Sequence, residues 1–268
     1  MKKIAVLIAF VLLIAVGDVA LTYNSPIIKS DRFEKNDFEI IKNSHSEKVW
    51  DKVIFGSDAV TCAYMEGEKG YVNLGLGGVK MTDLEKMIDT RHITLGTELV
   101  IGLDYTLFCG EDETEYIWDK KIYEPYVYFE RERLLPVIKN ETATSFVNEK
   151  TVRRGVVHER EMQKMVMQYE SMTAQNLAEN IASLENVIAY CNEKGINIRC
   201  VWMPWNVGYD KTAVLDEVRM TVDAVLSSHG IGVYDMESIF SVGDFYDVMH
   251  LNYDIGSPKF TALIDEWL

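Results

Sequence analysis

Two short segments far apart in the chain carry side chains that together could form a nucleophilic site. Residues 53–55 are apolar and end in Gly56 and Ser57, and near the other end Asp247 stands three residues before His250. A serine hydroxyl is a good nucleophile at neutral pH only when a base accepts its proton, and an imidazole base needs a group that orients it. The pattern predicts hydrolase or acyl-transfer chemistry, with Ser57 as nucleophile, His250 as base and Asp247 as orienting carboxylate.

Apolar runs alternate with helical patterns from about residue 47 to the end of the chain. Strand-like runs lie at 48–55, 70–76, 98–103, 196–202 and 231–236, and helical patterns at 58–66, 81–92, 163–194, 211–229 and 257–268. Strands that alternate with helices predict a three-layer α/β/α domain around a mainly parallel, flavodoxin-like sheet. Residues 110–154 show no regular pattern.

The loops after the first three expected strands should meet at one edge of this sheet. They contain residues 56–57, 75–78 and 102–105. In open parallel sheets the ligand lies outside the carboxyl ends of the strands, near the point where the strand order reverses. We therefore expect Ser57 to share one rim with the two glycine-containing loops.

These segments resemble the short sequence blocks of the SGNH (GDSL-like) hydrolase superfamily, over about residues 49–250. Ser57 lies in a Gly-Ser-Asp segment that is similar to the first block, although the usual order Gly-Asp-Ser is not kept. The Gly-Ser form is similar to that of exported proteins that modify cell-surface polymers, including alginate acetylation proteins and the D-alanyl transfer protein of teichoic acid. Gly78 falls where the family supplies an oxyanion-hole N–H, and Asp247 and His250 match the Asp-x-x-His block.

The third block departs from the family pattern. Residues 102–105 read Gly-Leu-Asp-Tyr, whereas the family has Gly-x-Asn-Asp, and its Asn donates a hydrogen bond to the oxyanion. An ionised Asp104 only accepts hydrogen bonds, and losing one oxyanion donor costs on the order of 10²–10³ in rate. Three alternatives remain: Asp104 is protonated, Tyr105 or Asn206 supplies the donor, or the activity is weak or specialised. We favour a substituted donor in an oxyanion hole of Ser57, Gly78 and position 104.

An aromatic segment follows the fourth expected strand. Trp205 and Asn206, together with Tyr105, are expected to line a rim for sugar or acyl groups, because aromatic surfaces suit both. Trp202 belongs to the same segment, but packing in the core is the better expectation for it.

The N-terminus has the pattern of an export signal. Lys2 and Lys3 precede an apolar run over residues 4–16, as in a secretory signal. A membrane-spanning helix needs about 20 residues, a length reached only by including Asp18. We expect residues 1–21 to be a cleaved signal peptide or an uncleaved anchor, 22–46 a tether, and 47–268 the SGNH-like domain, which is either secreted or anchored outside the cytoplasm.

The net charge and the cysteine spacing argue against two kinds of ligand, nucleic acid and a metal ion. The net charge is −15, which makes nucleic acid an improbable partner. The four cysteines, Cys62, Cys109, Cys191 and Cys200, lack the spacing of a metal site. They are buried thiols or, in an exported protein, up to two disulfides. We expect neither a metal nor an organic cofactor.

The resemblance implies an exported serine esterase or O-acyltransferase that acts on acyl esters of cell-envelope or exported polysaccharide. A membrane-bound acyltransferase would be its donor partner. One alternative is a secreted lipase or carbohydrate esterase with the same triad. Another is a non-catalytic envelope-assembly or carbohydrate-binding protein on a degenerate hydrolase fold, which the altered third block favours.

Overall fold

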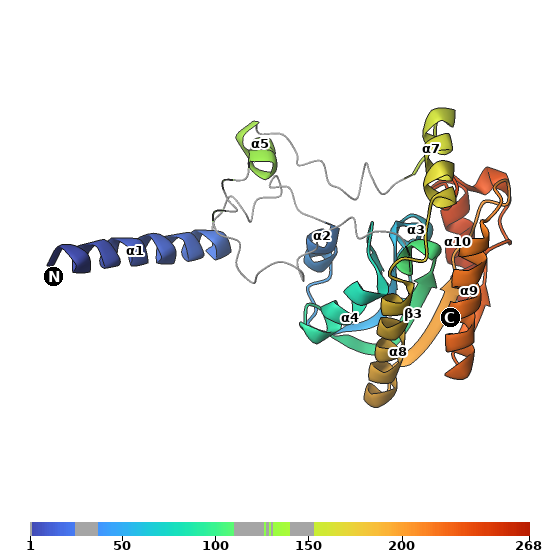
Figure 1. The fold of residues 1–268 in the computed structure, drawn as a ribbon, viewed down its shortest axis with the longest axis horizontal. Helices are drawn as coiled ribbons and strands as arrows, with labels where there is room; N and C mark the ends of the chain where they lie inside the picture. The colour runs from blue at the N-terminus through green and yellow to red at the C-terminus, as the bar shows by residue number, and fades with distance from the viewer. Residues whose placement is uncertain (1, 25–36, 110–125, 127–128, 130, 140–152) are drawn as a thin grey trace.

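The protein is built around one parallel sheet. The computed structural model describes residues 2–24, 37–109, 126, 129, 131–139 and 153–268, so most of the irregular stretch 110–154 lies outside the described residues (Figure 1). The strands are Trp50–Gly56 (β1), Val72–Gly75 (β2), Leu95–Leu103 (β3), Asn197–Trp202 (β4) and Gly232–Asp235 (β5). They pair in parallel in the order β2-β1-β3-β4-β5. The prediction of a parallel α/β sheet is confirmed.

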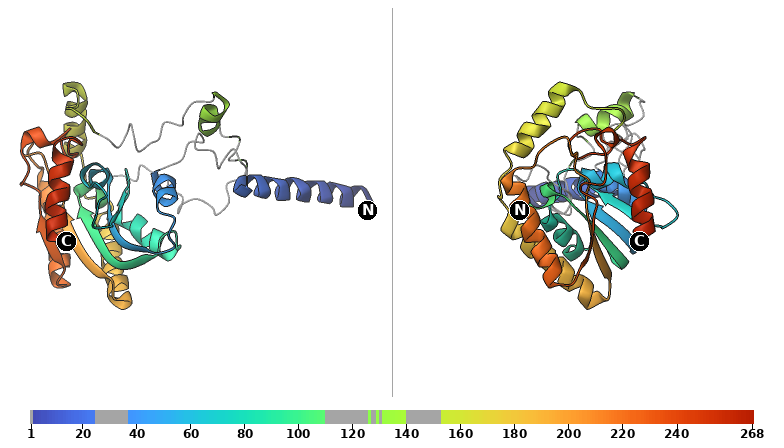
Figure 2. Two further views of the ribbon diagram at one scale, coloured as in Figure 1. Left: turned by 180° about the vertical axis from the view of Figure 1, so that it is seen from behind. Right: turned by 90° about the vertical axis from the view of Figure 1, so that its right-hand side faces the viewer.

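Helices cover both faces of the sheet (Figure 2). Asp58–Ala63 (α3) and Gly256–Trp267 (α10) pack together on one face, and Met81–Asp89 (α4), Leu177–Lys194 (α8) and Ala213–Ser228 (α9) form the layer on the other. The central strands are therefore buried on both sides: Val53, Ile54 and Phe55 of β1 have no exposed surface. This is why their sequence is a continuous apolar run rather than an alternating one.

The long helix expected over 163–194 is wrong. The structure has two helices there, Glu159–Glu170 (α7) and α8, and Asn176 between them adopts a left-handed φ of 64°. Asn tolerates that conformation better than most residues, so the chain can turn there. The apolar spacing nevertheless runs across the break, because Tyr169 of α7 and Leu184 of α8 both reach the core.

The N-terminal part contains two helices, Lys2–Asn24 (α1) and Asp37–Ser44 (α2), and a further helix, Arg131–Lys139 (α5), lies in the middle of the chain. Figure 1 shows α1 apart from the sheet. Its apolar side chains are largely exposed, including Phe10 at 60% and Leu13 at 71%. In the stretch expected to be a tether, Phe38 of α2 is buried and packs against Trp50 of β1. Within the described parts of the chain, no helix meets the length and apolarity needed to cross a membrane.

Three glycines lie in register at the carboxyl ends of neighbouring strands. Gly56 of β1 pairs with Gly75 of β2 and with Gly102 of β3. A Cβ added at Gly56 or Gly102 would lie 2.3 or 2.2 Å from Val60 Cγ2, and one at Gly75 would lie 2.3 Å from the backbone nitrogen of Thr61. Because these side chains are missing, α3 lies close against the sheet. It does so beside the pair of neighbouring strands β1 and β3, where the strand order reverses.

All four cysteines are free thiols, each buried in the core. Of the two alternatives from the sequence, the structure has thiols rather than disulfides. Burial raises the pKa of Cys62 to about 11 and that of Cys191 to about 12.

Candidate active site

Ser57 lies at the start of α3, directly after β1. Its backbone is extended, and its Oγ accepts a hydrogen bond from the N–H of Ala59 at 3.1 Å, so the serine caps the helix. The same hydroxyl donates to Oδ2 of Asp104 at 2.5 Å. Ser57 has no exposed surface. In this state the hydroxyl has both its donor and an acceptor position engaged.

Asp247 and His250 form a close pair in the loop before α10. The ring Nδ1 lies 2.8 Å from Oδ2 of Asp247, and Oδ1 accepts the backbone N–H groups of Met249 and His250 at 3.1 and 2.9 Å. The turn closes because one carboxylate serves both the ring and the backbone three residues later. This geometry fixes the ring orientation and leaves Nε2 pointing away from Asp247.

Asn206, which follows the end of β4, anchors this loop by two hydrogen bonds. Its side-chain nitrogen donates to the carbonyl of Asp247 at 3.0 Å, and its backbone N–H donates to the carbonyl of Val248 at 2.9 Å. Only 2% of Asn206 is exposed. The residue expected at a substrate rim therefore lies beneath the His250 loop and supports it.

The other ring nitrogen of His250 faces Asp58 rather than Ser57. Nε2 lies 3.0 Å from Oδ2 of Asp58, but it makes no hydrogen bond of acceptable geometry to any described residue. The structure thus brings the Gly-Ser segment and the Asp-x-x-His segment to one edge of the sheet. It does not link Ser57 to His250 by a hydrogen bond.

The contact between Asp58 and His250 shifts both pKa values. Burial alone would lower the pKa of His250, but the charges of Asp58 and Asp247 outweigh it and raise that pKa well above 6.5. Burial alone would raise the pKa of Asp58, but His250 and the charge of Arg153 hold it below 3.8. The two shifts favour an imidazolium at His250 and a carboxylate at Asp58.

Asp104, the residue at which the sequence departs from the SGNH pattern, is almost fully buried. Oδ1 accepts the backbone N–H groups of Thr106 at 2.8 Å and Leu107 at 3.3 Å, which caps a short 3-10 helix over Tyr105–Leu107 (η1). Burial raises the pKa of Asp104 more than its hydrogen bonds from Ser57 and Thr106 lower it, and the charge of Asp58 raises it further. The shift favours the neutral acid, which can donate a hydrogen bond.

The two substitute donors are engaged elsewhere. The hydroxyl of Tyr105 donates to Glu237, and the amide of Asn206 donates to the Asp247 carbonyl. Burial favours a protonated Asp104, and the identity of the oxyanion donor stays a prediction.

The second block lies beside Asp58. An added Cβ at Gly77 would lie 3.9 Å from Cβ of Asp58, and Gly78 has a φ of +74°, which a glycine adopts without strain. Lys80 then ties this loop to the third block, because its Nζ donates to the carbonyls of Thr106 and Cys109, each at 2.7 Å.

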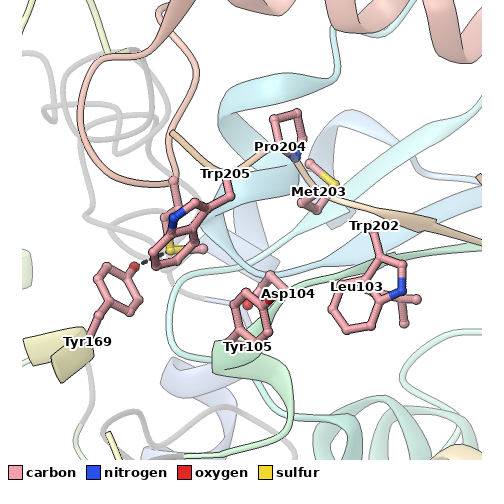
Figure 3. Close-up of a pocket in the computed structure, with 9 residues that line it drawn as sticks. Leu103, Asp104, Tyr105, Tyr169, Trp202, Met203, Pro204 and Trp205 are labelled. Carbon is pink, nitrogen blue, oxygen red and sulfur yellow. Dashed lines mark hydrogen bonds between the residues drawn. The ribbon is translucent and has the colours of Figure 1, made fainter. Parts of the chain in front are cut away.

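A small cavity opens between the ends of β3 and β4 (Figure 3). Its volume is about 10 Å³, and it is lined by Leu103, Asp104, Tyr105, Tyr169, Trp202, Met203, Pro204, Trp205 and Met249. Trp205 stands edge-on to the rings of Tyr105 and Tyr169, with centroids 5.6 and 5.3 Å away. The expected rim residues Tyr105 and Trp205 are thus buried walls of this cavity, and the lining side chains are mainly apolar.

Sequence reasoning missed Asp58 and Arg153. Asp58 stood beside the nucleophile in the sequence, so its position was a usable signal, but nothing indicated that it would face His250. Arg153 is far from every block in the sequence, but in the structure its guanidinium stacks over Tyr246 at 5.8 Å. Its buried Nε has no hydrogen-bond partner among the described residues. Within the same residues, no group of three or more His, Cys, Asp or Glu side chains could hold a metal ion.

Comparisons with known proteins give only distant likenesses. No family model matches the chain, and no curated protein matches it in sequence. Its structure is similar to a "putative acylhydrolase" from Bacteroides fragilis NCTC 9343, at 12% identity and a TM-score of 0.41, over 87% of this chain and 99% of that one. It is also similar to an active-site mutant of a family two carbohydrate esterase from Clostridium thermocellum, at 12% identity and a TM-score of 0.37, over 81% and 65%. Likeness at this level does not decide function.

Proposed function

We propose that the protein is a serine esterase or O-acyltransferase that acts on O-acyl groups of cell-envelope or exported polysaccharide. One observation carries the proposal: the bonded pair His250–Asp247 meets the strand-to-helix turn of Ser57 at the carboxyl edge of a parallel sheet. A nucleophile, a base and its orienting carboxylate at this edge suit acyl transfer.

The reaction begins when the hydroxyl of Ser57 attacks the ester carbonyl and passes its proton to Nε2 of His250. Asp247 stabilises the imidazolium through Nδ1. The backbone N–H groups of Ser57 and Gly78 and the neutral acid of Asp104 stabilise the oxyanion. His250 protonates the leaving alcohol, and water or a sugar hydroxyl then releases the acyl group from Ser57.

The cavity beside Asp104 is the proposed site of the acyl chain. On the measure by which one water molecule needs about 10–15 Å³, its volume of about 10 Å³ accommodates little more than a methyl group. Its apolar walls favour such a group over a polar one. The proposed substrates therefore carry short acyl esters, such as acetyl.

The proposed location is outside the cytoplasm, with α1 as a signal peptide or an anchor. The apolar side chains exposed along α1 would be favourable in a membrane and unfavourable in water. In the transferase form of the proposal, a membrane-bound acyltransferase supplies the acyl group. The reaction needs no metal or organic cofactor.

A non-catalytic carbohydrate-binding protein is the second candidate. It is favoured by the full burial of Ser57 and by the missing hydrogen bond between Ser57 and His250. A secreted lipase or carbohydrate esterase would share the triad and differ in its substrate.

Labelling with a small fluorophosphonate separates these candidates. We expect the wild type and the control Ser228→Ala, changed at an exposed serine of α9, to label, and Ser57→Ala to remain unlabelled. Circular dichroism should show that all three are folded. A wild type that stays unlabelled from pH 6 to pH 9, while a known serine esterase reacts, would overturn the enzyme proposal in favour of the binding protein.

A further inference from the structure

The contact between Asp58 and His250 has no role in the reaction described above. Asp58 Oδ2 lies 3.0 Å from Nε2, the atom to which Ser57 must pass its proton. The Ser57 hydroxyl meanwhile donates to Asp104. Each member of the nucleophile–base pair is thus held by a different aspartate side chain, and the transfer of a proton between them is blocked in this state.

Asp58 is well placed to move, whereas its neighbours are not. About 34% of its side chain is exposed, compared with 2% for Asp247 and 5% for His250. Asp58 is the first residue of α3, so its side chain can turn toward solvent without breaking a helix hydrogen bond. Nε2 holds Asp58 mainly by charge at 3.0 Å, since it makes no well-aligned hydrogen bond to any described residue.

We propose that Asp58 is a positioning residue that holds the site in a resting state, paired with His250 until it turns away and lets Ser57 approach Nε2. This inference rests on the proposed function. When Asp58 leaves, the proton on Nε2 passes to solvent water, and the hydroxyl of Ser57 rotates from Asp104 to the neutral ring nitrogen. The Nε2–H bond breaks as the water forms a new O–H bond, and no other covalent bond changes.

Several groups set the charge around His250. Asp58 of α3 and Asp247 of its own loop act on it directly, and its charge also reaches Cys62 of α3. Asp104, which caps η1, Tyr169 of α7, and Arg153, before α7, act on Asp58. Burial raises the pKa values of Cys62 and Tyr169, so neither carries charge near neutral pH. Asp104 is held toward its neutral form. The balance at Nε2 therefore depends mainly on Asp58, with Arg153 as the nearby cation that opposes it.

The release of Asp58 has a physical cause available in the substrate. Asp58 lies beside Gly77, next to the proposed nucleophile, so an acyl ester bound at Ser57 would displace water from around it. Because a carboxylate loses more from desolvation than a neutral ester does, the carboxylate gains by turning outward. The charge of Arg153 already acts on Asp58 and can compensate the carboxylate when it leaves His250.

The pKa of His250 tests the contact directly. The intact protein, labelled at its histidine rings, is titrated by NMR as wild type, Asp58→Asn and Asp58→Glu; His250→Gln assigns the signal, and Asp89→Asn, at an exposed position of α4, is the control. We expect Asp58→Asn to lower the pKa of His250, and Asp58→Glu and Asp89→Asn to leave it near the wild-type value. An unchanged pKa in Asp58→Asn would overturn the proposal.

The rate of fluorophosphonate labelling at pH 6 tests the consequence for Ser57. Removing one opposite charge beside the imidazole should raise the labelling rate of Asp58→Asn about tenfold over wild type, with Asp58→Glu restoring the slower rate. Asp58→Ser serves as a second charge-free variant if Asp58→Asn is unstable. A rate that is unchanged or lower despite a lowered pKa would overturn the resting-state role. If no variant labels, the proposed function fails, and the titration still decides whether Asp58 pairs with His250.

Discussion

The two halves of the candidate site differ in how far they are assembled. The C-terminal half is complete: Asp247 holds both the ring and the backbone of His250, and Asn206 holds the loop from beneath. In the N-terminal half, Ser57 is turned toward Asp104 and Asp58 occupies the place of the serine at Nε2.

The difference follows from how each half is built. The Asp247–His250 pair lies within one turn, so local chain geometry is enough to bring its members together. The N-terminal half joins three loops, and its two carboxyl groups, Asp58 and Asp104, contact the imidazole of His250 and the hydroxyl of Ser57. Pairing between loops is therefore decided by charge and side-chain rotation, which can change when a substrate binds.

The largest expected effect comes from breaking the complete half. Asp247→Asn removes the carboxylate that fixes the ring, and it should slow fluorophosphonate labelling at pH 8 by on the order of 10³–10⁴-fold. Asp254→Asn, at an exposed residue nearby that pairs with Arg154, should label at the wild-type rate. Equal rates for the two variants would show that His250 does not depend on Asp247.

Substitutions at position 104 test the N-terminal half of the site. Asp104→Leu removes the proposed donor and should slow hydrolysis of p-nitrophenyl acetate by about 10²–10³-fold, whereas Asp104→Asn should keep its rate. The donor is the acid form, which is lost as pH rises through the raised pKa of Asp104. The wild-type rate should therefore fall at high pH while that of Asp104→Asn does not. An Asn variant as slow as the Leu variant would exclude this role.

The three glycines at the ends of β1, β2 and β3 let α3 pack close to the sheet beside Ser57. Adding a side chain at one of them should lower the stability of the fold. A Cβ at Gly75 would lie 2.3 Å from the backbone of α3, so Gly75→Ala should lower the free energy of unfolding by about 1–3 kcal/mol in urea denaturation. Gly232→Ala in β5, where nothing lies within 4 Å of the new Cβ, is the control. Equal stability of the two variants would contradict the close packing of α3.

The smallest expected effect is the pH dependence of stability. The pKa of His250 is raised above its ordinary value of 6.5, so its contribution is fully present below pH 6.5 and is lost as pH rises through the raised value. His250→Gln should therefore lose most stability, relative to wild type, in acid, and the difference should shrink toward high pH. A gap that widens with pH in urea titrations would contradict the charged pair.

Much of this arrangement could be predicted from the sequence, and the rest depended on contacts between distant segments. The apolar runs predicted the strands, and the spacing of Asp247 and His250 anticipated a pair that one turn can close. The break at Asn176 escaped notice because α7 and α8 both pack on the core, so the apolar spacing continues through it. The partner of Nε2 could not be predicted from the sequence, because Ser57 and Asp58 are adjacent and the sequence does not show which of the two side chains faces the ring.

The reactivity of the buried cysteines can be used to measure how often the fold opens. None of the four thiols has more than 2% of its surface exposed, and their raised pKa values keep them protonated at neutral pH. A thiol-specific reagent can react with them only in molecules where the core has come apart. The rate at which the folded chain reacts with such a reagent therefore measures how often each layer of the domain opens. The rate at Cys62 measures the opening of the layer that contains Ser57.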